Sequence, residues 1–108
     1  MYAANMKSSE KFDNNLFYWL FPTPNEENLN LSDIPLVINM NCGLGSTSMY
    51  GLFTETGPLR VKQLDPNDHD SFQIDYNPDD SWSSLGDLLY IDHPVGAGWS
   101  YGTHSPTN

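Results

Sequence analysis

Two short apolar segments, 35–40 and 87–92, constrain the fold of this chain more than any other feature. They read Pro-Leu-Val-Ile-Asn-Met and Asp-Leu-Leu-Tyr-Ile-Asp. Apolar runs of this length are typical of strands buried in a parallel sheet. A loop rich in Gly or Pro follows each of them, at 41–46 and 93–98. We therefore expect the strands to be neighbours in one open, largely parallel sheet, with both loops at its carboxyl edge, where α/β proteins carry functional residues.

The other segments predict mostly strands and turns, with little helix. The aromatic run at 16–21 ends at Pro22, which fits a strand closed by a breaker residue. Short strands are expected at 59–61 and 72–76, and a short helix at 47–53. The core is expected to contain the aromatic side chains of Tyr18, Trp19, Trp82 and Tyr90.

The charge balance excludes one large class of function. Fourteen acidic residues against four basic ones give a net charge of −10, and the acidic residues are spread along the chain. Such a surface is a poor electrostatic match for nucleic acid or for anionic lipid. Basic patches interleaved with aromatic residues, which RNA and DNA binding require, are missing. The sequence therefore predicts no nucleic-acid partner.

The sequence also predicts no membrane insertion, disulfide or metal site. No apolar run approaches the roughly 20 residues of a membrane helix. The start, Met1–Lys7, lacks the apolar stretch of a signal peptide, so either secretion is absent or the natural start lies elsewhere. Cys42 is the only cysteine and excludes an internal disulfide. His69, His93 and His104 lack ligand spacing.

The expected sheet is incomplete. Parallel strands need helices over both faces, and the sequence offers one short candidate. The outer strands would also leave open edges unless something pairs with them. A protein partner that covers these edges is therefore one expectation.

The loop at Asn41–Ser46 reads Asn-Cys-Gly-Leu-Gly-Ser. A glycine-rich backbone at the end of a buried strand is how α/β hydrolases present main-chain N–H groups to a developing oxyanion. An alternative is that Gly43 and Gly45 only permit a tight turn with positive φ.

Several blocks of the sequence resemble serine carboxypeptidases, the α/β-hydrolase peptidases that remove C-terminal residues. The blocks run in family order through 15–19, 35–37, 41–58, 77–82 and 88–102. Family members carry Asn-Gly-Gly-Pro-Gly-Cys-Ser-Ser, then Gly-Leu-Phe-x-Glu-x-Gly-Pro, and later Asp-Gln-Pro-Val-Gly-x-Gly-Phe-Ser-Tyr. The resemblance implies that residues 1–108 form a single partial domain. This would be the N-terminal segment of an α/β-hydrolase fold, an incomplete, mostly β sheet with little helix.

The same resemblance implies roles for four residues. The backbone N–H of Gly43 would donate to the oxyanion, and Asn41 and the backbone at Cys42 would bind the terminal carboxylate of a peptide. Glu55 would form a hydrogen-bonded carboxyl pair with a second glutamate that lies outside these residues, which favours mildly acidic pH. No cofactor is implied. The plainer alternatives are that Glu55 is a surface acid and that Cys42 is a small buried residue.

Departures from the family pattern cluster on the loop. Cys42 replaces a glycine, Leu44 a proline and Ser46 a cysteine, while Asn39 replaces a tryptophan on the preceding strand. These changes fall where catalysis tolerates least, and they predict reduced activity.

Gly98–Gly102 matches the G-x-S-x-G nucleophile elbow in its letters. The elbow requires a strand that runs directly into a helix, and a Pro/Gly loop precedes the motif here. No acid follows Asp92, so the hydrolase order of Ser, acid and His also fails. Ser100 is therefore not expected to be a nucleophile.

Two functions remain. The first is a serine-type carboxypeptidase-like polypeptide, either a fragment or a truncated relative, inactive alone because it lacks nucleophile, acid and base. The second is a non-catalytic subunit or interaction protein that reuses the front half of the fold. Family members usually work in vacuoles, in lysosomes or outside the cell, and the sequence leaves the location of this chain open.

Overall fold

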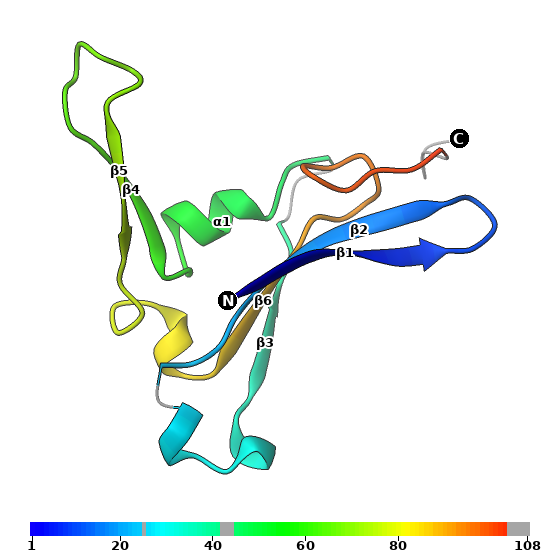
Figure 1. Cartoon of the computed structure of the whole chain (residues 1–108), viewed down its shortest axis with the longest axis horizontal. Helices are drawn as coiled ribbons and strands as arrows, with labels where there is room; N and C mark the ends of the chain where they lie inside the picture. Colours follow the sequence, from blue (N-terminus) through cyan, green and yellow to red (C-terminus); the bar gives the residue numbers. More distant parts are fainter. Residues whose placement is uncertain (25, 42–44, 104–108) are drawn as a thin grey trace.

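The computed structural model describes residues 1–24, 26–41 and 45–103. Its main body is a four-stranded sheet with the strand order β1-β2-β6-β3. The strands are β1 (Tyr2–Ser9), β2 (Asn14–Phe21), β3 (Leu36–Asn39) and β6 (Asp87–Ile91), as Figure 1 shows. The predicted strands at 16–21, 35–40 and 87–92 are confirmed.

A second, smaller sheet is the hairpin of β4 (Leu59–Gln63) and β5 (Phe72–Tyr76), which projects away from the main sheet (Figure 1). The predicted strands at 59–61 and 72–76 are thus confirmed. The predicted helix at 47–53 is α1 (Met49–Thr54). Three short 3-10 turns lie in the connections: η1 (Glu26–Asn28), η2 (Leu31–Asp33) and η3 (Trp82–Ser84).

The prediction of a largely parallel sheet is wrong. β3 and β6 are parallel neighbours as expected, with Val37 opposite Leu88 and Asn39 opposite Tyr90. β1 pairs with β2, and β2 with β6, in antiparallel fashion. For β1 and β2 the reason is their short connection, because a turn of a few residues can join only antiparallel strands. The sheet is therefore mixed, with one parallel pair at its β3 edge.

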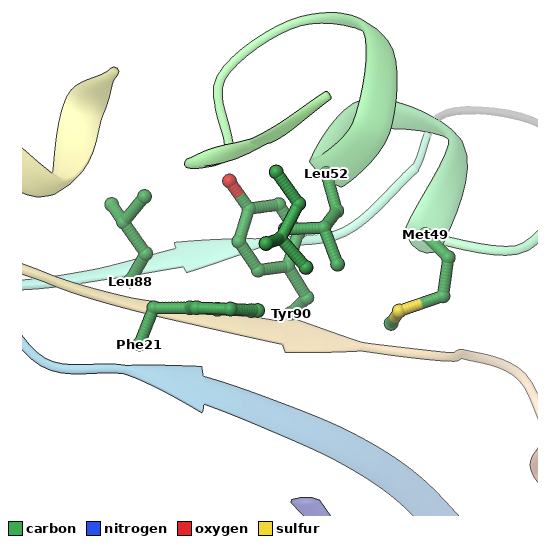
Figure 2. Close-up of a cluster of buried hydrophobic side chains, with 6 residues drawn as sticks. Phe21, Met49, Leu52, Leu88 and Tyr90 are labelled. Carbon is green, nitrogen blue, oxygen red and sulfur yellow. The ribbon is translucent and has the colours of Figure 1, made fainter. Parts of the chain in front are cut away.

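The core lies between one face of the sheet and α1 (Figure 2). Leu88 and Tyr90 alternate along β6 with Leu89 and Ile91, so that one pair faces the helix and the other faces away. Leu52 on α1 is fully buried against them, and the six buried residues of the cluster are Phe21, Met49, Leu52, Leu59, Leu88 and Tyr90. Burying a side chain of this size contributes about 1.5–3 kcal/mol, so this cluster fixes α1 on the sheet.

The opposite face of the sheet is open within the described residues. Met6, Leu36 and Ile38 are each about half exposed there. The expectation that 35–40 is a buried strand is therefore wrong: among the described residues β3 is an edge strand next to β6, and its side chains alternate between exposed and half-buried.

Two of the expected core aromatics, Tyr18 and Trp82, lie outside the core. Tyr18 alternates with Trp19 along β2, so it faces the open side of the sheet, where it lines a groove with Leu20 and Ile91. Tyr90 is fully buried and Trp19 packs against the core, but the Trp82 side chain is 51% exposed. Trp82 begins the turn η3, and its backbone N–H donates to the carbonyl of Thr56 at 3.0 Å. The turn is thus held by its main chain and leaves the indole ring outside.

None of the helices among the described residues is long and apolar enough to cross a membrane.

Candidate functional site

The carboxyl ends of the parallel strands β3 and β6 lie side by side, as the sequence predicts. Asn39 is opposite Tyr90 in the register, so the chain leaves the sheet at Asn41 on one strand and at Asp92 on the other. The loops that follow therefore meet at the same edge of the sheet.

The carboxyl group of Asp92 joins the two loops. Its side chain is fully buried. Oδ1 accepts hydrogen bonds from the hydroxyl of Thr47 and from the backbone N–H of Ser48, both at 2.7 Å. Oδ2 accepts a hydrogen bond from the backbone N–H of Trp99 at 2.9 Å. A buried carboxyl group needs such donors, and here they come from both loops.

Ser48 connects the Asp92 carboxyl group to the backbone of Asn41. The Ser48 hydroxyl donates to the carbonyl of Ile91, at the end of β6, and accepts a hydrogen bond from the backbone N–H of Asn41 at 3.1 Å. Ser48 is itself buried. The backbone at Asn41 is thus tied to β6 through one serine side chain.

Asn41 and Glu55 line the same small pocket. It measures about 50 Å³, and its other lining residues are Asn39, Met40, Ser48, Gly51, Thr56 and Tyr90. Glu55 ends α1, and its backbone N–H donates to the carbonyl of Gly51 at 3.0 Å. The volume accommodates a water molecule or a small polar group, because one water takes up about 30 Å³ in the liquid.

Two hydroxyl groups that are hydrogen-bonded to each other line this pocket. The hydroxyl groups of Thr56 and Tyr90 lie 2.8 Å apart in a hydrogen bond. Burial raises the pKa of the Tyr90 hydroxyl, while the bond from Thr56 and the charge of Arg60 act in the opposite direction. Asn39 accepts a weak hydrogen bond from Thr56 at 3.4 Å, and its buried Nδ2 has no hydrogen-bond partner among the described residues.

The structure brings together two of the four predicted site residues. Asn41 and Glu55 line one pocket although 14 positions separate them in the sequence. Gly43 and Cys42 lie outside the described residues, as does Leu44. Sequence reasoning gave no role to Asp92 or Ser48. An acid at the end of an apolar strand, just before a Pro/Gly loop, was the available signal for Asp92.

Ser100 is an internal structural residue. Its side chain is buried, and its hydroxyl donates to the carbonyl of Asp92 at 2.6 Å. The same oxygen accepts a hydrogen bond from the backbone N–H of Phe17 at 2.7 Å. A hydroxyl group that is hydrogen-bonded to two main-chain groups in this way is not free to attack a substrate. This agrees with the expectation from the sequence.

Among the described residues, no group of three or more His, Cys, Asp or Glu side chains is placed to hold a metal ion.

Comparison with protein families decides the relationship. The family model described as serine carboxypeptidase matches residues 1–108. The chain belongs to the serine carboxypeptidase family. The fold that this family implied, the N-terminal part of an α/β-hydrolase with a mostly β sheet and little helix, is confirmed.

Individual serine carboxypeptidases and a solved structure agree. A serine carboxypeptidase family member from Dictyostelium discoideum is 42% identical over 93% of this chain, and the venom serine carboxypeptidase of Apis mellifera is 36% identical over 93%. The crystal structure of Kex1, a prohormone-processing carboxypeptidase from Saccharomyces cerevisiae, covers 92% of this chain at 33% identity with a TM-score of 0.69.

The chain spans only part of the length of those proteins. It covers 17% of the Dictyostelium protein, 19% of the Apis protein and 20% of the Kex1 chain.

Proposed function

We propose that these residues form part of the substrate-binding region of a serine-type carboxypeptidase, which hydrolyses the C-terminal peptide bond of a peptide. The observation that carries this proposal is the likeness to the Kex1 carboxypeptidase, with 33% identity and a TM-score of 0.69 over 92% of the chain. At this identity the likeness extends beyond the fold. The shared pocket of Asn41 and Glu55, at the carboxyl edge of the sheet, supports it.

In the proposed reaction this region binds and orients the peptide. Asn41 and the backbone at Cys42 bind the terminal carboxylate, and the backbone N–H of Gly43 donates to the oxyanion. Such donors stabilise the charge that develops on the carbonyl oxygen as a serine attacks. Glu55, which lines the same pocket as Asn41, forms a hydrogen-bonded pair with a second carboxyl group outside these residues.

The attacking serine belongs to another part of the proposed enzyme. Ser100 is bridged between Phe17 and Asp92, so it does not serve as the nucleophile. The 108 residues are therefore expected to show no peptidase activity by themselves.

The test compares the natural polypeptide that carries these residues with the 108-residue chain. Each is incubated with an N-blocked dipeptide, and release of the C-terminal amino acid is measured. The natural polypeptide should release it and lose this activity after treatment with a serine-directed phosphonate. Turnover by the 108-residue chain, or none by the natural polypeptide, would contradict the proposal.

A matched pair of variants tests the binding role of Asn41. Removing a hydrogen bond to a charged group costs about 1.5–3 kcal/mol, so Asn41→Ala should lower kcat/KM about 10- to 100-fold. Asn67→Ala is the control, because Asn67 is exposed and its backbone N–H, at 2.9 Å from Asp65, is kept in the variant. Equal activities of the two variants would remove Asn41 from the site.

The second candidate function is a non-catalytic interaction protein. The open apolar face around Met6, Leu36 and Ile38 favours it, because exposed apolar patches mark interaction surfaces. This alternative expects no turnover and a stable complex with another polypeptide, visible as a larger particle in size-exclusion chromatography. The carboxypeptidase proposal expects turnover by the natural polypeptide.

A further inference from the structure

The buried carboxyl group of Asp92 is linked by hydrogen bonds to the backbone of Asn41 and to the start of α1, the helix that Glu55 follows. Asp92 accepts from the backbone N–H of Ser48, and the hydroxyl of Ser48 accepts from the backbone N–H of Asn41. This is a path of two hydrogen bonds from Asp92 to the residue assigned to the terminal carboxylate.

A second path runs from Asp92 to α1. The hydroxyl of Thr47 donates to Asp92 at 2.7 Å and accepts from the backbone N–H of Met49, the first residue of α1, at 3.2 Å. One otherwise free N–H of the helix is thereby satisfied, which fixes where the helix begins. Glu55 follows the last residue of this short helix as its C-cap, and its backbone N–H donates to the carbonyl of Gly51, so its position depends on that of the helix.

We propose that Asp92 is a positioning residue for recognition of the terminal carboxylate, setting Asn41 through Ser48 and Glu55 through Thr47. The proposal rests on the proposed carboxypeptidase function. Asp92 does not line the pocket and so acts on the substrate only through these neighbours.

At position 92 a carboxyl group can accept hydrogen bonds on both of its oxygens, and the surrounding groups require this. The three groups that face its two oxygens are all donors: one hydroxyl and two N–H groups. An asparagine there would set its own N–H₂ against a donor of Thr47, Ser48 or Trp99 and lose at least one bond. Asp92→Asn therefore disturbs the network without changing the size of the side chain.

The chain offers a matched control on the same strand. Asp87 begins β6 at its other end, and its Oδ1 accepts a hydrogen bond from the backbone N–H of Thr23 at 2.8 Å. Asp87→Asn makes the same chemical change and also weakens a bond to the main chain. It lies at the far end of the strand from Asn41.

The experiment compares hydrolysis of an N-blocked dipeptide with hydrolysis of its C-terminal amide by the natural polypeptide. The ratio of kcat/KM for the free acid to kcat/KM for the amide reports recognition of the carboxylate. Asp92→Asn should lower this ratio about tenfold or more, mainly through KM, because one charge-assisted contact is misplaced. Asp87→Asn should leave it unchanged. An equal loss for both substrates would mean that Asp92 only supports folding, and would overturn the proposal.

Two milder variants, both at Thr47, test the same proposal if Asp92→Asn fails to fold. Thr47→Val removes the hydroxyl that links Asp92 to Met49, whereas Thr47→Ser keeps it. The valine variant should lower the same ratio and the serine variant should restore it. A serine variant that behaves like the valine variant would contradict the proposal.

Amide hydrogen exchange separates failure of this inference from failure of the proposed function. In Asp92→Asn the amides of Asn41 and Ser48 should exchange faster, while amides between β1 and β2 keep their rates. If the natural polypeptide hydrolyses no peptide, the carboxypeptidase proposal fails, and unchanged exchange at Asn41 would then refute the positioning role as well.

Discussion

The carboxyl group of Asp92 occupies the space that a side chain on Gly98 would need. A Cβ built on Gly98 would overlap Oδ2 and Cγ of Asp92 and would lie 2.7 Å from the hydroxyl oxygen of Thr47. Gly98 also has a φ of +51°, in the left-handed region. Gly96, on the same loop, has a φ of +97° but nothing within 4 Å of its Cβ position. A substitution at Gly96 therefore introduces backbone strain alone, whereas one at Gly98 introduces both backbone strain and overlap with the Asp92 side chain.

Gly98→Ala should destabilise the protein much more than Gly96→Ala. At Gly96 the change adds only the strain of a left-handed residue, about 1–2 kcal/mol. At Gly98 it must also displace the Asp92 carboxyl group from its donors, which adds about 1–3 kcal/mol. Urea unfolding of the two variants measures both losses. If both variants lost the same free energy of unfolding, moving the Asp92 carboxyl group away from its donors would not destabilise the protein.

The contact between α1 and the sheet should depend on Leu52. Its side chain is fully buried in the cluster of Figure 2, and no other helix among the described residues packs there. Leu52→Ala should lower the free energy of unfolding by about 2–5 kcal/mol. Leu85→Ala is the control, because Leu85 is 69% exposed and its loss should stay within about 0.5 kcal/mol. Thermal unfolding of both variants tests this, and a small effect at Leu52 would mean that the helix is held chiefly by Thr47 and Ser48.

The apolar runs of this sequence predict strands well but not their surroundings. The run at 87–92 forms β6, an inner strand of the sheet, and its Leu88 and Tyr90 side chains are buried. The similar run at 35–40 forms an edge strand with Leu36 and Ile38 about half exposed. Periodicity cannot distinguish these cases, because burial depends on which elements from elsewhere in the chain cover each face.

One strand gave no signal of its own. β1, Tyr2–Ser9, contains no Val, Ile or Thr and is exposed almost throughout. It is held by its pairing with β2, from Tyr2 opposite Leu20 to Ser9 opposite Asn14. A strand stabilised by main-chain pairing rather than by burial leaves little trace in composition.

The sequence named candidate site residues only where family motifs exist, and it named none where the fold alone brings side chains together. Asn41 and Glu55 stand at positions of those motifs, their roles stay predictions, and the structure places both on one pocket. The role of Asp92 depends on donors from residues 47, 48 and 99, which only the folded chain brings together.

The stability of the protein in alkali should depend on Tyr90. Burial raises the pKa of its hydroxyl, and the Thr56 bond and the Arg60 charge only partly offset this. The unfolded chain therefore loses this proton at a lower pH than the folded chain. Since the unfolded state then binds fewer protons, the free energy of unfolding falls as pH rises above the ordinary tyrosine pKa of about 10.

Tyr90→Phe should show a shallower fall in the free energy of unfolding over this alkaline range. Below this pH range the free energy of unfolding of the variant should be lower than that of wild type by about 1 kcal/mol, because the variant lacks one hydrogen bond to Thr56. Tyr76→Phe controls for the loss of an exposed phenol, since Tyr76 is 54% exposed. Urea unfolding at a series of pH values measures both slopes, and identical slopes for wild type and Tyr90→Phe would refute the prediction.

Ser100 should matter for stability and not for attack on a substrate. Its hydroxyl satisfies the N–H of Phe17 and the carbonyl of Asp92, so Ser100→Ala leaves two main-chain groups without this partner. Unsatisfied buried groups cost about 1–3 kcal/mol each, and we expect a loss within that range after local relaxation. Ser32→Ala is the control, because Ser32 is exposed and makes only a 3.4 Å contact to Asp33.

Labelling distinguishes this structural role of Ser100 from a catalytic one. In the natural polypeptide, a serine-directed phosphonate should modify wild type and Ser100→Ala to the same extent under conditions where both are folded. Mass spectrometry of the labelled peptides should find no adduct on 98–102. If instead the label were located on Ser100, or were lost in Ser100→Ala while the free energy of unfolding stayed unchanged, the hydroxyl would have to leave its two main-chain partners, and the G-x-S-x-G sequence would be a working nucleophile elbow.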